Sequence, residues 1–122
     1  MLRFDGAGAA AWRQVVIDGL DPVLGRRGVS TLLVRSGRGP ESVSEVVFGS
    51  LPDGPFEVRE HGMKLLVDVV EGQKTGLFLD HRPSRLLVRQ LADDLEVLNL
   101  YGYTGAFSVA AGLGGARAVD TV

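Results

Sequence analysis

The sequence predicts an α/β protein: a small antiparallel α+β region over residues 1–72, followed by the start of a parallel sheet over residues 73–122. Two observations support this prediction. After one amphipathic helix, short apolar segments separated by turn residues fill the first region, which is typical of antiparallel strands. The second region has the order strand, helix, strand from Glu96 onward, and this order favours a right-handed parallel crossover.

One helix is predicted near the N-terminus, over residues 9–24. Its apolar side chains recur at helical spacing, and the stripe expected to be buried comprises Trp12, Val15, Val16, Leu20 and Leu24. We expect this helix to end or bend near Asp21-Pro22, because proline lacks the backbone N–H that a helix interior needs.

The remainder of the first region is predicted to form strands. Residues 30–34 are a short apolar run with β-branched side chains, and residues 44–48, 56–60 and 63–70 are further candidates that would form a small antiparallel sheet. The last two candidates are separated by His61-Gly62, which suits a two-residue hairpin turn.

The second region begins with a helix. Pro83 suits its first turn, and its apolar stripe runs to about Ala92. Residues 96–100 are predicted to be a buried strand, residues 106–113 a helix rich in small side chains, and residues 117–119 a second strand.

Composition limits the possible functions. The chain has 122 residues, 45% apolar and 23% charged, which suits one domain with an ordinary core. Its net charge of −2 gives no global attraction to nucleic acid, so a polyanion would need a local basic patch. Cysteine is absent, which excludes disulfides, thiolate zinc sites and a cysteine nucleophile within these residues. No apolar run suits a signal peptide or a membrane span, so we expect a cytoplasmic protein with no membrane partner.

A glycine-bearing loop joins the strand at 96–100 to the helix at 106–113. Gly102 and Gly105 permit a tight turn whose backbone N–H groups, beside the positive end of the helix dipole, suit a carboxylate or a phosphate. Thr104 can cap the helix through its hydroxyl. The side chains that offer flat faces to a heterocycle or a sulfonium cation are Tyr101 and Tyr103.

Asp120 lies 18 positions after Gly102, close to the roughly 20 at which an acidic residue reaches a ribose diol. The loop carries Gly-x-x-Gly and lacks the Gly-x-Gly-x-x-Gly of dinucleotide sites, so nothing in it requires a pyrophosphate. An ordinary turn between a strand and a helix, with tyrosines packed beside it, explains the same residues without a ligand.

Three segments together resemble successive motifs of one enzyme family. They are Lys74-Thr-Gly-Leu-Phe-Leu-Asp-His-Arg82, Asn99-Leu-Tyr-Gly-Tyr-Thr-Gly105 and Ala111-Gly-Leu-Gly-Gly-Ala-Arg117. The family is that of the class I S-adenosylmethionine-dependent methyltransferases that modify large-subunit ribosomal RNA, and the similarity covers roughly residues 56–120. It implies a Rossmann-like domain that transfers a methyl group to a base, at cytosine C5 in one branch and at guanine N7 in another.

The resemblance also implies a site for the cofactor S-adenosylmethionine. Its methionine end would be held by Asn99, Tyr101, Tyr103, Thr104 and Gly105, and its ribose hydroxyls by Asp120. The residues that would close over it are Thr75, Phe78, Asp80 and Arg82. Arg82 is expected to bind the cofactor carboxylate, because a guanidinium pairs with both oxygens. An ion pair with Asp80 or a contact at a helix end is the alternative for Arg82, and core packing is the alternative for Phe78.

No catalytic residue is assigned within the chain. In this family the acceptor-side motifs lie in later strands, so we expect the C-terminal part of the catalytic domain to be missing and the chain alone to be inactive. Ribosomal RNA is the expected partner. The candidate RNA contacts are the arginines of a stretch without acidic residues, Arg26, Arg27, Arg35 and Arg38, for which a solvated surface is the alternative.

Two other functions are possible. A noncatalytic RNA-binding or assembly module could carry the same loop as a relic. The missing dinucleotide glycines argue against an NAD-dependent enzyme. No metal site is expected, because neither His61 nor His81 has a second ligand at metal spacing.

Overall fold

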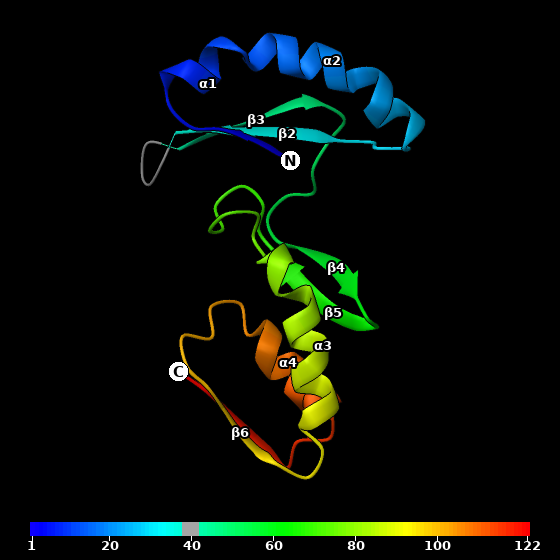
Figure 1. Ribbon diagram of the computed structural model, residues 1–122, viewed down its shortest axis with the longest axis vertical. Helices are drawn as coiled ribbons and strands as arrows, with labels where there is room; N and C mark the ends of the chain where they lie inside the picture. The colour runs from blue at the N-terminus through cyan, green and yellow to red at the C-terminus, as the bar shows by residue number, and fades with distance from the viewer. Residues whose placement is uncertain (38–41) are drawn as a thin grey trace. The chain divides into compact units, whose positions relative to one another are not determined.

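The computed structural model describes residues 1–37 and 42–122, which form two compact units, Met1–Asp53 and Gly54–Val122 (Figure 1). Helices and small sheets alternate along the chain, so the predicted α/β class is confirmed. The predicted boundary at residues 72 and 73 falls inside the second compact unit.

The first unit is a three-stranded sheet with helices. Its elements are β1 (Leu2–Phe4), α1 (Ala7–Ala11), α2 (Arg13–Arg26), β2 (Leu32–Ser36) and β3 (Val43–Phe48). The strand order is β1-β2-β3, with β1 parallel and β3 antiparallel to β2. Strand β1 was not predicted, because three residues are too few to show a periodic pattern.

Helix α2 packs on this sheet through a different face from the predicted one. Ile17 is buried against Phe4, Leu32 and Val34. Trp12, by contrast, is 64% exposed. The prediction that Trp12, Val15 and Val16 are buried is therefore wrong, while Leu20 and Leu24 are half-buried. Each residue advances about 100° around a helix, so a short shift along the sequence selects another face.

Proline does not end this helix. Pro22 lies inside α2, which continues to Arg26, so the expected stop near Asp21-Pro22 is wrong. Proline removes one hydrogen bond from a helix interior. Ile17 and Leu24 belong to the same apolar cluster on either side of Pro22, and this packing holds both halves of the helix on the sheet.

The second unit starts with a hairpin, β4 (Phe56–Glu60) and β5 (Met63–Val67), which pair antiparallel. At the turn, φ is 49° for His61 and 81° for Gly62, as a two-residue primed turn requires, so the predicted hairpin is confirmed. The hairpin is a sheet of its own: β3 pairs with β2 and does not join it as expected.

The rest of the second unit contains a short 3-10 helix, η2 (Leu79–His81), then α3 (Arg82–Leu91), β6 (Glu96–Asn99), α4 (Ala106–Leu113) and β7 (Ala118–Thr121). Strands β6 and β7 are parallel, as predicted from the order strand, helix, strand. Met63, Leu65 and Val67 of the hairpin form one buried cluster with Leu77, Ala106 and Ala110. The small side chains of α4 therefore allow the hairpin and the β6–α4–β7 segment to share a core.

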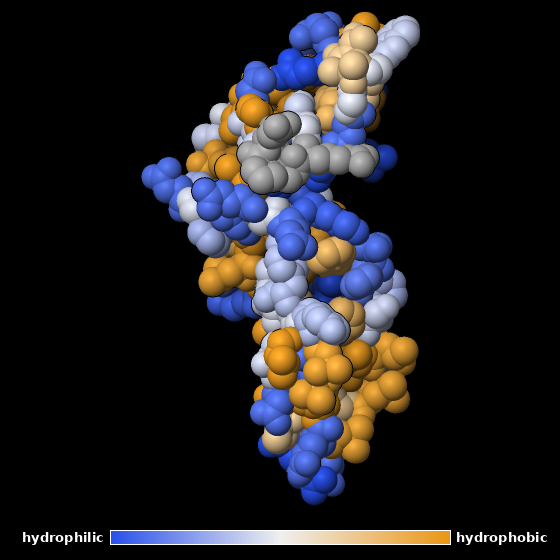
Figure 2. Space-filling model, turned by 90° about the vertical axis from the view of Figure 1, so that its left-hand side faces the viewer, coloured by the Kyte–Doolittle hydropathy of each residue, from blue (hydrophilic) through white to orange (hydrophobic). Residues whose placement is uncertain are grey.

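Apolar side chains are also exposed in this unit. They gather over the part of this unit that holds β6 and β7 (Figure 2). Leu98 is 62% exposed, and Leu100 and Val122 are exposed with it. The face of the β6–β7 pair toward α4 is half-buried and the other face is exposed, so the expectation of a buried strand at residues 96–100 is wrong.

Candidate functional site

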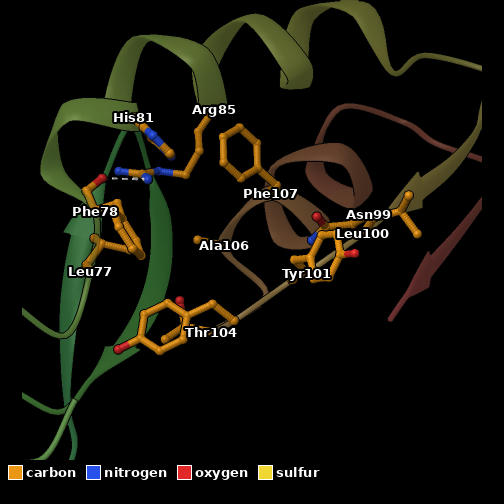
Figure 3. A pocket seen from close by; sticks show the side chains of 12 residues that line it. Leu77, Phe78, His81, Arg85, Asn99, Leu100, Tyr101, Thr104, Ala106 and Phe107 are labelled. Atoms are coloured by element: carbon orange, nitrogen blue, oxygen red, sulfur yellow. Dashed lines mark hydrogen bonds between the residues drawn. The ribbon is translucent and has the colours of Figure 1, made fainter. Parts of the chain in front are cut away.

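The second unit contains a cavity of about 320 Å³ where β6 ends (Figure 3). Its walls come from the segment before α3, from α3 itself, from the loop after β6 and from the start of α4. The lining residues are Leu77, Phe78, His81, Arg85, Asn99, Leu100, Tyr101, Gly102, Tyr103, Thr104, Ala106 and Phe107. A volume of this size lies at the lower end of the range for small-molecule sites, and the carboxyl end of a parallel strand is where such sites form.

The loop after β6 has an unusual backbone. Tyr101 and Tyr103 have φ values of 57° and 48°, and Gly105 has 72°. Two backbone bonds tie the loop to the end of β7: Gly102 N donates to Val122 O (3.1 Å), and Val122 N donates to Asn99 O (3.0 Å). Left-handed backbone at non-glycine residues costs about 1–3 kcal/mol each and persists where the surrounding structure fixes it.

A chain of polar side chains connects β6, α4 and β7. Asn99 Nδ2 donates to Ser108 Oγ (2.8 Å), and Ser108 Oγ bonds Thr121 Oγ1 (2.7 Å). A Cβ on Gly102 would lie 2.3 Å from Thr121 Cγ2, so only glycine allows the loop this close to β7. The sequence analysis missed Ser108, because a serine in a helix of small residues gives no signal beyond packing.

A second loop, between β5 and η2, contacts the first through both the hydroxyl and the ring of Tyr103. The Oδ1 atom of Asp68 accepts hydrogen bonds from the backbone N–H groups of Val70 and Glu71. Gln73 N donates to the hydroxyl of Tyr103 (2.8 Å). Tyr103 therefore lines the cavity with its ring and orders the neighbouring loop with its hydroxyl.

Aromatic rings dominate one wall of the cavity. Phe78 stacks on His81 with ring centroids 5.4 Å apart, and the edge of Tyr103 meets Phe78 at 5.7 Å. The Nζ atom of Lys74 lies 4.5 Å from the centroid of the Phe78 ring, and this contact shows that a cation can rest against this wall. Phe107, 5.8 Å from His81, extends the wall onto α4.

A buried ion pair forms part of the cavity wall through Arg85. Arg85 and Glu60 have side chains 1% and 7% exposed, and Arg85 Nε and Nη2 donate to the two carboxylate oxygens at 2.8 and 2.7 Å. The hydrogen bonds from Arg85 hold the pKa of Glu60 below its ordinary value, against the opposing effect of burial. Arg85 Nη1 also donates to Phe78 O (2.9 Å), so this pair fixes the aromatic wall. Sequence analysis missed the pair, whose members are 25 residues apart.

Five of the ten residues predicted for the cofactor line this cavity: Phe78, Asn99, Tyr101, Tyr103 and Thr104. Thr104 does not cap α4 as expected, because Gly105 occupies the N-cap position and no side chain bonds there. The change follows from the left-handed backbone of Gly105, which begins the helix one residue later.

The other five predicted residues lie outside the lining. Thr75 Oγ1 donates to the Leu77 carbonyl, and Asp80 is exposed with Oδ2 3.9 Å from His81 Nε2. Arg82 begins α3 and donates from Nε to Nε2 of His61 (3.2 Å). Gly105, the fourth, is the N-cap of α4 and has no side chain to offer.

Asp120, the fifth, is in β7, in register with Leu98. Side chains alternate between the faces of a strand, and the next residues, Asn99 and Thr121, are linked to Ser108 of α4. Asp120 is therefore on the face turned away from α4, where it is exposed.

Three of the four predicted RNA contacts lie in the described residues, at two places in the first unit. Arg26 and Arg27 end α2, just before the turn into β2. Arg35 lies near the far end of β2, beside Arg3 of β1, and its Nε donates to Ser42 Oγ (2.7 Å). Arg38 lies outside the described residues.

The described residues contain neither a candidate metal site nor a candidate membrane-spanning helix. No group of three or more His, Cys, Asp or Glu side chains in residues 1–37 and 42–122 could hold a metal ion. Within the same ranges, no helix has the length and apolar character needed to cross a membrane.

Comparisons with known proteins identify the family. Residues 20–122 match a family model described as S-adenosylmethionine-dependent methyltransferase. The whole chain is 41% identical to the ribosomal RNA large subunit methyltransferase I of Klebsiella pneumoniae subsp. pneumoniae and 39% identical to that of Escherichia coli O157:H7. It spans only 31% and 32% of those two proteins, about a third of their length.

Two solved structures are also similar to this chain. A Streptococcus mutans protein assigned as a SAM-dependent methyltransferase aligns with a TM-score of 0.82 and 29% identity, over 98% of this chain and 31% of that one. The assigned methyltransferase SMU.776, complexed with SAH, aligns with a TM-score of 0.75 and 29% identity, over 90% of this chain and 29% of that one. From its motifs, its parallel β6–α4–β7 segment and these similarities, the chain belongs to the S-adenosylmethionine-dependent methyltransferase family.

Proposed function

We propose that this chain provides the cofactor-binding part of an S-adenosylmethionine-dependent methyltransferase that acts on a base of large-subunit ribosomal RNA. The cavity at the carboxyl end of β6 is the observation that supports the proposal most directly. It combines a glycine loop tied to β7, a polar link through Ser108 and an aromatic wall. A ribosomal RNA substrate would place the protein in the cytoplasm, as the sequence analysis expected.

The cavity suits the methionine end of the cofactor. A sulfonium cation is attracted to the faces of aromatic rings, and Phe78 and Tyr103 supply such faces here, whereas Tyr101 is 95% exposed. Asn99 and Thr104 add polar groups to the same walls. We propose these five residues as the inner part of the cofactor site.

The remaining predicted residues, Thr75, Asp80, Arg82, Gly105 and Asp120, are proposed as its surroundings. A ribose bound by Asp120 would have to extend beyond the cavity, past the exposed edge of β7. A cofactor carboxylate could reach Arg82 only if the guanidinium left His61. Both requirements make these two contacts weaker candidates than the residues of the lining.

In the proposed reaction, methyl transfer depends on how the cofactor and the acceptor base are positioned relative to each other. S-adenosylmethionine, when bound, supplies an electrophilic methyl group, which transfers when the acceptor atom is in line with the bond that breaks. The residues of this chain would hold the cofactor in one orientation and keep water from it, and such positioning can contribute several kcal/mol. The groups that act on the base are proposed to lie in the part of the longer relatives that this chain does not span. Cytosine C5 and guanine N7 are the two candidate acceptors.

Two glycines provide a matched test of the cofactor site. Gly102→Ala places a methyl group against Thr121, whose hydroxyl is bonded to Ser108, and against Asn99. Gly112→Ala, in α4, meets nothing within 4 Å. We expect Gly102→Ala to weaken binding of S-adenosylmethionine at least about tenfold, which is roughly 1.4 kcal/mol. Gly112→Ala should bind as the wild type does.

Isothermal calorimetry on the full-length protein would measure both affinities. An unchanged affinity in Gly102→Ala would contradict the site, and a wild type without affinity would favour the noncatalytic RNA-binding module. Mass spectrometry of ribosomal RNA nucleosides, from cells with and without the gene, would then decide between cytosine C5 and guanine N7.

A further inference from the structure

Two arginines of α3 are fixed against the turn of the β4–β5 hairpin. Arg82 Nε donates to His61 Nε2 (3.2 Å), and Arg89 Nη1 donates to His61 O (2.7 Å). The two arginines are seven residues apart, so they lie on the same side of α3 about 10.5 Å apart along its axis. We call Arg82, Arg89 and His61 the hairpin-turn cluster.

We propose that the hairpin-turn cluster binds phosphates of the RNA substrate. This inference rests on the proposed function, because it takes RNA to be the substrate. It differs from the sequence prediction, which placed the RNA contacts at Arg26, Arg27, Arg35 and Arg38.

The first argument is that no carboxylate bonds either cation within the described ranges. Arg82 and Arg89 donate to an imidazole nitrogen and a carbonyl oxygen, and within the described ranges neither forms an ion pair. Five other arginines in those ranges do bond carboxylates, namely Arg3, Arg13, Arg59, Arg85 and Arg117. Two guanidinium groups that no carboxylate in those ranges bonds therefore favour an anionic ligand.

The second argument is the charge around the cluster. The hairpin and the η2–α3 segment, residues 56–67 and 79–91, hold five basic and three acidic side chains, a net +2, whereas the whole chain is −2. Of the three carboxylates, Glu60 is bonded to Arg85. Glu57 bonds both Arg59 and Lys64, and Asp80 lies beside His81. The basic character of this surface is thus local.

The third argument is the geometry. A guanidinium offers parallel N–H groups that fit a phosphate, and the bond to His61 uses only Nε of Arg82. Both guanidinium groups bond atoms of His61, so they lie at the same hairpin turn and would contact neighbouring phosphates of one strand. The same helix also contributes Arg85 to the cavity wall, so RNA held here would pass close to the proposed cofactor.

The test compares two double variants of the full-length protein that change its net charge equally. Arg82→Gln/Arg89→Gln removes the cations of the cluster. Arg59→Gln/Arg117→Gln removes two exposed arginines that are ion-paired, one of them on the same hairpin. Binding of large-subunit ribosomal RNA transcribed in vitro would be measured by filter binding between 50 and 200 mM KCl, a range over which phosphate contacts change affinity strongly.

We expect the cluster variant to bind RNA about tenfold more weakly, with a salt dependence reduced by about 0.7–0.9 for each lost contact. The control variant should retain its affinity and its salt dependence. Arg89→Gln alone should bind S-adenosylmethionine normally while losing part of the RNA affinity. If the double variant does not fold, Arg89→Gln alone still tests the proposal.

Three outcomes would overturn the proposal. One is unchanged RNA binding in the cluster variant, and another is an equal loss in both double variants, which would indicate a diffuse charge effect. The third is an Arg82→Gln variant that loses cofactor affinity and keeps RNA affinity, because Arg82 would then bind the cofactor carboxylate. A wild type that binds RNA but not S-adenosylmethionine would contradict the proposed function and leave this test intact.

Discussion

The two compact units are stabilised in different ways. In Met1–Asp53 the buried cluster is entirely apolar and lies between α2 and one sheet. In Gly54–Val122 an apolar cluster is accompanied by the buried pair Glu60–Arg85 and by a cavity of about 320 Å³. A purely apolar core needs only side chains of the right total volume in the right hydrophobic pattern. A buried ion pair, by contrast, needs defined hydrogen-bond geometry to offset the hydration that its two charges lose. The second unit therefore has the features that orient side chains around a ligand.

The two units also differ in where their backbone adopts positive φ. In the described part of the chain, the five non-glycine residues with positive φ are His61, Lys74, Asp94, Tyr101 and Tyr103, and all lie in the second unit. The positive-φ residues described in the first unit are glycines. Such strain gathers at ligand sites. Tyr101 and Tyr103 line the cavity, and His61 belongs to the hairpin-turn cluster.

The largest predicted effect is loss of the buried pair. Arg85→Met leaves Glu60 buried without its partner, and we expect this to cost about 3–5 kcal/mol of stability in the second unit. Amide hydrogen exchange in β4 and α3 of the full-length protein would measure it. Glu57→Gln, which removes exposed ion pairs, is the control and should cost less than about 1 kcal/mol. Equal effects would remove the proposed difference between the units.

The next prediction tests the packing of the first unit. Ile17→Ala opens a cavity between α2 and the sheet and should cost about 2–5 kcal/mol, seen as faster exchange in β2. Trp12→Ala removes a larger but exposed side chain and should change stability by no more than about 0.5 kcal/mol. If Trp12→Ala cost as much as Ile17→Ala, the originally predicted apolar stripe would be the buried one after all.

Acid should affect the second unit through Glu60. Its pKa is lowered in the folded state, so the stability it contributes is present above the unfolded value of about 4.3 and is lost as pH falls through the lowered folded value. We expect exchange in β4 and α3 to accelerate over this acidic range. In Glu60→Gln that acceleration should be weaker, although the variant is less stable at neutral pH. Parallel pH profiles for both proteins would show that another group is responsible.

The smallest predicted effect concerns the link between the two loops. Tyr103→Phe keeps the ring in the cavity and removes the acceptor for Gln73 N, at a cost of about 0.5–1.5 kcal/mol. Exchange of the Gln73 amide should increase while that of β6 stays constant. Tyr101→Phe, whose side chain is 95% exposed, is the control. An unchanged Gln73 amide would show that the loop is ordered without Tyr103.

Local signals in the sequence determined much of the fold. His61-Gly62 predicted the hairpin, because both residues tolerate the positive φ that the turn requires. The run of small side chains over residues 106–113 was predicted to be a helix and forms α4, and the order of elements predicted the parallel β6–β7 pair. The glycine loop was found for the same reason: its signal is contained in a few neighbouring residues.

The tertiary structure decided which side chains meet. The pairs Glu60–Arg85 and Asn99–Ser108, and the contact of His61 with Arg89, join residues 25, 9 and 28 positions apart. A helix pattern shows that one face is apolar but not which residues lie against a sheet, so the buried face of α2 was predicted incorrectly. Contacts of this kind depend on how folded elements pack, and packing is settled only when the whole unit has formed.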